Sequence, residues 1–193
     1  MRGLLTVAGG GIGVVVAGML AALATGSPST GATEAAEEQP RAIRRIVFLG
    51  NSLTHHGPRA EVDWDGDWGM AASAPEKDYV HLVTAAVAER TGEKPEILVR
   101  NIADFERGYA DYDVEKELRD ALDFRADLVV LAIGENVAPF ESDDAGARFQ
   151  AGVEAILAGT AGDRRPLQIV RSCFWENEAK DAPLRAAAEK AAA

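Results

Sequence analysis

An alternation of β-rich and helix-forming segments constrains this chain more than any other feature, beginning near Ile43. Such alternation predicts βαβ units and a parallel sheet with helices on both faces. The run Leu128 to Ile133 is apolar throughout, as expected for a central strand covered on both sides. We therefore expect a three-layer, doubly wound α/β fold of the flavodoxin-like type. The predicted strands are residues 44–49, 95–101, 126–134 and 166–172, and the predicted helices are residues 76–92, 113–124, 142–159 and 182–193.

The N-terminal segment is small and apolar. Residues 4–24 follow a single basic residue, Arg2, and end in the small-x-small pattern Ala22-Leu23-Ala24. We interpret residues 1–24 as a signal for export to the periplasm or the medium, so the protein is predicted to be secreted or periplasmic. An uncleaved membrane anchor is the alternative, because the run is long enough to span a bilayer. Residues 25–42 are polar and proline-punctuated, which predicts a flexible linker before a domain at residues 43–193.

The formal net charge of −11 disfavours nucleic acid and anionic lipid as partners, because both need a basic surface. Cys173 is the only cysteine, so no intramolecular disulfide can form, and a small buried thiol is the expected state. No cysteine and histidine spacing indicates structural zinc. Asp63, Asp65 and Asp67 alternate along one segment, but it lacks the glycine and glutamate of a calcium loop, so no metal site is predicted.

Polar and aromatic side chains follow each predicted strand. Because the carboxyl ends of parallel strands share one edge of a sheet, we expect these side chains to converge. Ser52 places a hydroxyl at a strand-to-helix turn, and Asn136 offers a neutral amide donor. The segments concerned are Gly50-Asn51-Ser52, residues 101–107, Gly134-Glu135-Asn136 and residues 172–175.

Two of these segments resemble motif blocks of the SGNH (GDSL-type) hydrolases. VFLGNSLT, residues 47–54, is similar to the first block, and LAIGEN, residues 131–136, is similar to the third. Residues 50–82 resemble a bacterial, often exported subgroup of these enzymes. The resemblance covers Ile46 to about Trp175. It implies the SGNH hydrolase fold and ester hydrolysis without a metal or an organic cofactor.

Carried over to this chain, the resemblance makes Ser52 the nucleophile and the Asn136 side chain an oxyanion donor. Gly134, in the oxyanion loop, would be small to admit the substrate. Ser52 would attack an ester carbonyl and form an acyl-enzyme that water then hydrolyses. The residues expected to contact substrate are Asn51, His55, Asn101, Phe105, Glu106, Glu135 and Trp175.

The chain departs from the family pattern at two places. Asp104-Phe105-Glu106-Arg107 stands where the second block has a glycine, and these charged residues are either a pocket wall or a surface ion-pair cluster. The family's catalytic histidine follows a fifth strand, and no Asp-x-x-His motif occurs here. On a helix, His56 would point away from the turn of Ser52, which makes a direct hydrogen bond awkward. We therefore expect a chain truncated before its last strand, helix and catalytic histidine, with little or no ester hydrolysis.

The sequence thus predicts an exported serine ester hydrolase whose full-length form deacetylates a carbohydrate or another small ester. The tryptophans of the segment EVDWDGDWGM, Trp64 and Trp68, fit sugar stacking, although either could cap the core. The alternative is a non-catalytic glycan-binding domain of the same fold. A nucleotide site at the Gly50 turn lacks the necessary basic residues and glycine spacing.

Overall fold

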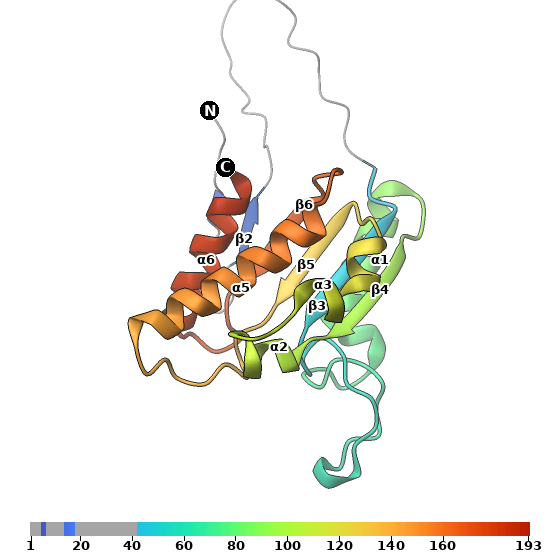
Figure 1. Ribbon diagram of the computed structural model, residues 1–193. Helices are drawn as coiled ribbons and strands as arrows, with labels where there is room; N and C mark the ends of the chain where they lie inside the picture. The colour runs from blue at the N-terminus through green and yellow to red at the C-terminus, as the bar shows by residue number, and fades with distance from the viewer. Residues whose placement is uncertain (1–4, 7–13, 18–41) are drawn as a thin grey trace, which may run out of the picture.

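The computed structural model of this chain describes residues 5–6, 14–17 and 42–193. Their sheet runs in the order β1-β2-β6-β5-β3-β4 (Figure 1). The strands are β1 (Leu5–Thr6), β2 (Val14–Ala17), β3 (Arg45–Gly50), β4 (Glu96–Asn101), β5 (Leu128–Ala132) and β6 (Leu167–Arg171). Strands β3, β4, β5 and β6 are parallel to one another. They lie side by side in the order β4-β3-β5-β6, so the second of the four along the chain is at the edge, next to the first. This order is that of a flavodoxin-like sheet, which confirms the predicted α/β class.

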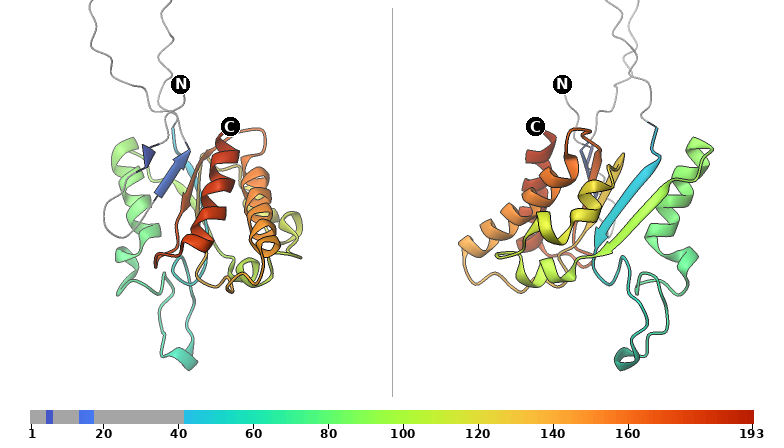
Figure 2. Two further views of the ribbon diagram at one scale, coloured as in Figure 1. Left: turned by 90° about the vertical axis from the view of Figure 1, so that its left-hand side faces the viewer. Right: turned by 45° about the vertical axis from the view of Figure 1, so that its right-hand side comes forward.

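Helices cover both faces of the sheet (Figure 2). Helix α1 lies on one face, and α5 and α6 lie on the other. The helices are α1 (Tyr79–Thr91), α2 (Ala103–Gly108), α3 (Val114–Glu117), α4 (Arg119–Asp123), α5 (Asp143–Ala161) and α6 (Glu178–Ala192), with single 3₁₀ turns at η1 (Ala60–Val62) and η2 (Pro75–Lys77). The sequence also predicts that Asp113 caps the helix after it and that Gly92 ends the helix before it. Both are confirmed: the Asp113 side chain accepts a hydrogen bond from Lys116 N, and Gly92 ends α1. The helix predicted over residues 113–124 is instead split at the buried Leu118, whose backbone leaves the helical conformation.

Alternation along β3 builds two hydrophobic cores. Ile46 and Phe48 pack on the α1 side, while Val47 and Leu49 pack on the side of α5 and α6. All four side chains are completely buried. The prediction that residues 128–133 form a strand buried on both faces is confirmed over β5.

The segment after β3 is a long loop, so the strand-to-helix turn expected at Ser52, with His56 on the helix that follows, is not formed. The amides of Thr54 and His55 bond to Asn51 O at 2.9 and 3.1 Å, which makes a single turn. The Asn51 side chain closes that turn by accepting from Leu53 N at 3.0 Å, and a proline at position 58 then prevents a helix from continuing. Residues 51–78 extend beyond the carboxyl edge of the sheet before α1 begins (Figure 1).

Strand β2 pairs antiparallel with β6 at one edge of the sheet. Apart from β1 and β2, the predicted export signal lies outside the described residues, as does the predicted linker apart from Ala42. Within residues 5–6, 14–17 and 42–193, no helix is both long enough and apolar enough to cross a membrane.

Candidate functional site

The ends of four parallel strands meet at the carboxyl edge of the sheet, as the sequence predicted. Asn51 follows β3, Glu106 lies in α2 after β4, Glu135 and Asn136 follow β5, and Arg171 ends β6. Their side chains form one polar network between β3 and β5, where the strand order reverses. Ligands of open α/β sheets bind at such switch points.

Glu106 is the centre of this network. Its side chain is fully buried and accepts four hydrogen bonds. Oε1 accepts from Gly134 N at 2.6 Å, Asn136 N at 3.1 Å and Asn51 Nδ2 at 3.1 Å, while Oε2 accepts from Asn136 Nδ2 at 2.7 Å. All four partners are N–H donors, so the carboxyl group acts only as an acceptor. It therefore fixes both the backbone of the Gly134–Asn136 loop and the Asn136 amide.

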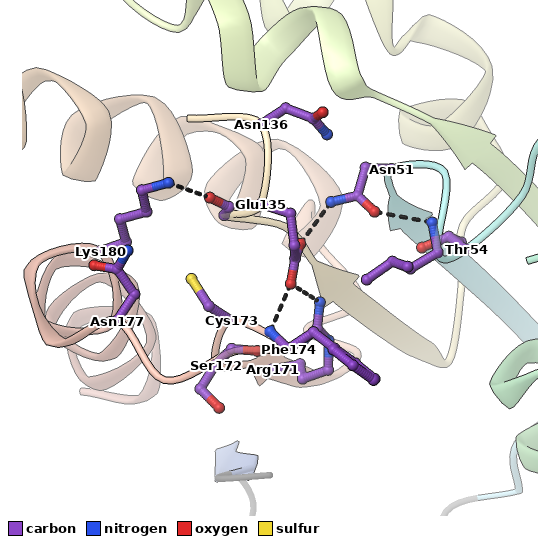
Figure 3. A network of polar contacts seen from close by, with 12 residues as sticks. Asn51, Thr54, Glu135, Asn136, Arg171, Ser172, Cys173, Phe174, Asn177 and Lys180 are labelled. Carbon is purple, nitrogen blue, oxygen red and sulfur yellow. Dashed lines mark hydrogen bonds and ion pairs between the residues drawn. The ribbon is translucent and has the colours of Figure 1, made fainter. Parts of the chain in front are cut away.

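Glu135 is the second carboxylate that Asn51 binds, and Figure 3 shows its contacts. It accepts from Arg171 Nη2 at 2.7 Å, Phe174 N at 2.6 Å and Asn51 Nδ2 at 2.6 Å. Burial pushes the pKa of Glu135 upward, but the charge of Arg171 and these hydrogen bonds outweigh burial and hold the pKa below its ordinary value of 4.5. Asn51 bonds to both carboxylates and so ties the end of β3 to the ends of β4 and β5.

Ser52 and Asn136 open into a shared pocket of about 410 Å³. The Ser52 side chain is half-buried, and its hydroxyl makes no hydrogen bond to any residue that the structure describes. Asn136 uses one amide N–H for Glu106, and the second has no partner among the described residues. The other lining residues are His56, Arg59, Val62, Met70, Asn101, Ala103, Asp104 and Arg107.

Gly134 lies beside this pocket but faces the interior. A side chain there would collide with Cys173 Sγ, and its φ of +126° is one that other residues rarely adopt. Its N–H donates to Glu106, and its carbonyl oxygen accepts from Lys180 Nζ at 3.0 Å (Figure 3). Close packing and backbone conformation therefore explain this glycine, rather than the substrate access that was predicted.

Of the three histidines, His56 lines the pocket that holds Ser52. Its Nδ1 lies 2.6 Å from Gly57 O, and because a carbonyl oxygen only accepts, Nδ1 carries the proton. The opposite nitrogen, Nε2, is then the basic atom of the neutral ring. His56 lies in extended backbone paired with Trp68, so the argument from helical spacing against a contact with Ser52 does not apply. His55 instead pairs with Asp67 at 3.0 Å.

Of the residues predicted to contact substrate, only Asn101 lines the pocket that holds Ser52, and Asn51, His55, Phe105, Glu106, Glu135 and Trp175 do not. Asn101 lines the pocket, where its Nδ2 donates to His55 O at 2.9 Å. Phe105 and Glu106 are fully buried on the inner side of α2, and Asp104 and Arg107 of the same helix line the pocket instead. Of the two alternatives left open for these charged residues, both apply to Asp104 and Arg107, which line the pocket and also form an exposed ion pair at 3.2 Å, whereas neither applies to the buried Glu106. Arg59 and Met70 were missed because nothing in the sequence shows how the long loop folds back.

Aromatic pairs lie on either side of the network. Trp64 and Trp68 pack edge to face at 5.1 Å, and their indole N–H groups donate to His56 O and Ala72 O, so they brace the long loop. Trp175 is different, because 69% of it is exposed and it packs on Phe174 at 4.9 Å. The exposed ring beside the network is therefore Trp175.

Cys173 is buried, as predicted. The pKa of this thiol is raised to about 12, mainly by burial and secondly by the hydrogen bond between the thiol and Asp181. Within the described part of the chain, no three His, Cys, Asp or Glu side chains are grouped so as to hold a metal ion.

Comparison of this chain with models of known families, with curated proteins and with solved structures finds no match.

Proposed function

We propose that this protein is a serine ester hydrolase of the SGNH (GDSL) type that acts through an acyl-enzyme on Ser52. The observation that carries the proposal is the pocket at the switch point, because Ser52, whose hydroxyl has no partner among the described residues, and Asn136 both line it. A nucleophile and a fixed N–H donor on one pocket are two of the three groups that acyl transfer requires, and the third is a base. Acetylated carbohydrates are the proposed substrate class, and export to the periplasm or medium is the proposed location.

In the proposed reaction, Ser52 Oγ attacks the carbonyl carbon while a base takes its proton. The carbonyl oxygen becomes an oxyanion that accepts the second N–H of Asn136, whose amide Glu106 holds in place. The alcohol then leaves with the proton, and water releases the acid from Ser52 by the reverse steps. No metal or organic cofactor takes part.

His56 is the candidate base, because it shares the pocket with Ser52 and its Nε2 is the nitrogen able to take a proton. This differs from the SGNH hydrolases, which use a histidine after a fifth strand. If His56 does not act, Ser52 has no other histidine in the lining of this pocket among the described residues, and hydrolysis should be negligible, as expected from the sequence.

A serine-directed phosphonate probe, mapped by mass spectrometry on the full chain, tests the proposal. We expect labelling at Ser52 that is lost in Ser52→Ala and retained in Ser73→Ala, which changes an exposed serine outside the pocket. Loss of labelling in His56→Ala but not in His81→Ala identifies the base. Absence of labelling in the wild-type chain refutes a self-sufficient hydrolase.

A second candidate function is glycan binding without catalysis. The pair of Phe174 and Trp175 favours it, because Phe174 N donates to Glu135 of the polar network and exposed aromatic rings can stack on sugar faces. Neutral oligosaccharides are titrated into the wild-type protein and into Trp175→Ala, and binding is monitored by NMR. Binding to the wild type that is weaker in Trp175→Ala, without labelling by the phosphonate probe, favours the glycan-binding domain over the hydrolase.

A further inference from the structure

The pocket that Ser52 lines contains two arginines, and neither of them is paired with a buried carboxylate. Arg59 enters from the long loop and Arg107 from α2, and both line the pocket. The other charged residue of the lining, Asp104, is a single carboxylate, so the fixed charges of the wall sum to a positive value. A lining with more cationic than anionic side chains is unexpected in a chain whose formal charge is −11.

Neither arginine is committed to its present neighbour. Arg107 donates to Asp104 at 3.2 Å, but 94% of the Asp104 side chain is exposed to solvent. Arg59 lies 3.7 Å from a Glu61 carboxylate whose side chain is 77% exposed, and no hydrogen bond joins them. Exposed ion pairs of this kind contribute little, so a ligand can replace them at low cost.

Arg171, at the end of β6, differs from these two arginines because its ion pair is buried. Its guanidinium pairs with Glu135 at 2.7 Å, and both side chains are largely buried. That pair joins the loop after β5 to the end of β6, Arg171 Nη1 also donates to Ser172 O at 2.6 Å, and Arg171 is not among the residues that line the pocket. Arg59 and Arg107 are therefore the cations of the pocket that can turn to a substrate.

We propose that the pocket selects esters that carry an anionic group, which Arg59 and Arg107 bind while the ester carbonyl lies at Ser52. A guanidinium offers a planar fork of N–H donors that fits a carboxylate or a phosphate with two hydrogen bonds. An acetylated acidic sugar has this chemistry, whereas a neutral acetylated sugar does not. This inference rests on the proposed function and specifies its substrate class.

Hydrolysis of three matched acetyl esters tests the selection: para-acetoxybenzoate, para-acetoxyphenyl phosphate and the neutral para-acetoxybenzamide. We expect kcat/KM for at least one anion to exceed that for the amide, and the ratio to fall at least about tenfold in Arg107→Gln, the size expected for loss of a charge-assisted hydrogen bond. Arg59→Gln should act in the same direction. Comparing carboxylate with phosphate tells which anion the pocket takes.

Arg148→Gln is the matched control. Arg148 forms an exposed ion pair with Asp144 one turn away on α5, outside the pocket, so this change removes the same charge elsewhere. The ratio should stay at its wild-type value in this variant. An equal loss in Arg148→Gln and Arg107→Gln would mean that overall charge, rather than the pocket, sets the preference, and would overturn the inference.

Binding of a stable analogue separates this inference from the proposed function. NMR titration of the wild-type chain compares para-acetamidobenzoate with the neutral para-acetamidobenzamide, neither of which the serine needs to cleave. Binding of the carboxylate that weakens in Arg59→Gln and Arg107→Gln supports the anion site even if no ester is hydrolysed. Equal binding of the two analogues, or binding of neither, overturns the inference even if neutral esters are cleaved.

Discussion

Replacement of Glu106 by glutamine is the sharpest perturbation of the network. The amide keeps one oxygen, which can still accept from Gly134 N, Asn136 N and Asn51 Nδ2. It places an NH₂ group where Oε2 accepted from Asn136 Nδ2 at 2.7 Å, so two donors face each other. One hydrogen bond to a charged group is lost, and the other three become neutral and weaker.

We expect Glu106→Gln to lower the free energy of unfolding by about 3 kcal/mol, of which the lost bond accounts for about half or more. For a chain of this size, the midpoint of thermal unfolding should fall by about 6 to 12 °C. Circular dichroism measures both quantities in thermal and urea unfolding. Glu115→Gln, at an exposed glutamate of α3, is the control and should change the unfolding free energy by less than about 0.5 kcal/mol.

The double variant Glu106→Gln with Asn136→Asp separates support of the fold from support of catalysis. The glutamine NH₂ can then donate to the new carboxylate, so part of the lost stability should return. Ester hydrolysis should not return, because residue 136 no longer donates to an oxyanion. A Glu106→Gln protein as stable as the wild type would refute the assignment of Glu106 as the centre of the network.

Three further predictions follow from the same region. Gly134→Ala should destabilise the fold by about 2 kcal/mol or more, because of its φ of +126° and the collision with Cys173 Sγ, whereas Gly108→Ala, where nothing lies within 4 Å, should not; thermal unfolding compares them. The Glu135 pKa is lowered on folding, so the stability that its ionised form adds is complete above the ordinary pKa of 4.5 and disappears as the pH falls through the folded pKa. The difference in unfolding free energy between wild type and Glu135→Gln should therefore shrink in acid, and a constant difference would contradict the pairing with Arg171. Cys173, with a pKa near 12, should resist iodoacetamide in the native protein and react once urea unfolds it; rapid native labelling would show that the thiol is accessible.

The apolar runs predicted the strands of the sheet well, and the capping residues predicted helix ends, because both are local signals. The four parallel strands were recognised from apolar runs, and Asp113 and Gly92 from cap chemistry. Helix α2 shows where local signals end. Asp104 and Arg107 are three residues apart and share one face, while Phe105 and Glu106 turn inward. Helical periodicity alone could have separated these pairs, had residues 103–108 been recognised as a helix.

The burial of Glu106 lay beyond any pattern in the sequence. Glutamate is almost never fully buried without partners, so the default expectation places it at the surface or in a pocket. Here the partners come from β3 and from the loop after β5, and their convergence depends on the strand order. A buried polar group is therefore predictable only once the topology is known.

Gly50, at the end of β3, and the two residues after it, Asn51 and Ser52, each have a different role. Gly50 allows close packing, because a side chain there would approach Ala132 O of the neighbouring strand to 2.7 Å. Asn51 is buried and joins both carboxylates of the network. Ser52 alone turns outward, into the pocket, with its hydroxyl uncommitted to any described residue. Gly50 and Asn51 hold the strand ends together. Because they form this rigid framework, the hydroxyl of Ser52 is not needed for structural hydrogen bonds and is available for the proposed reaction.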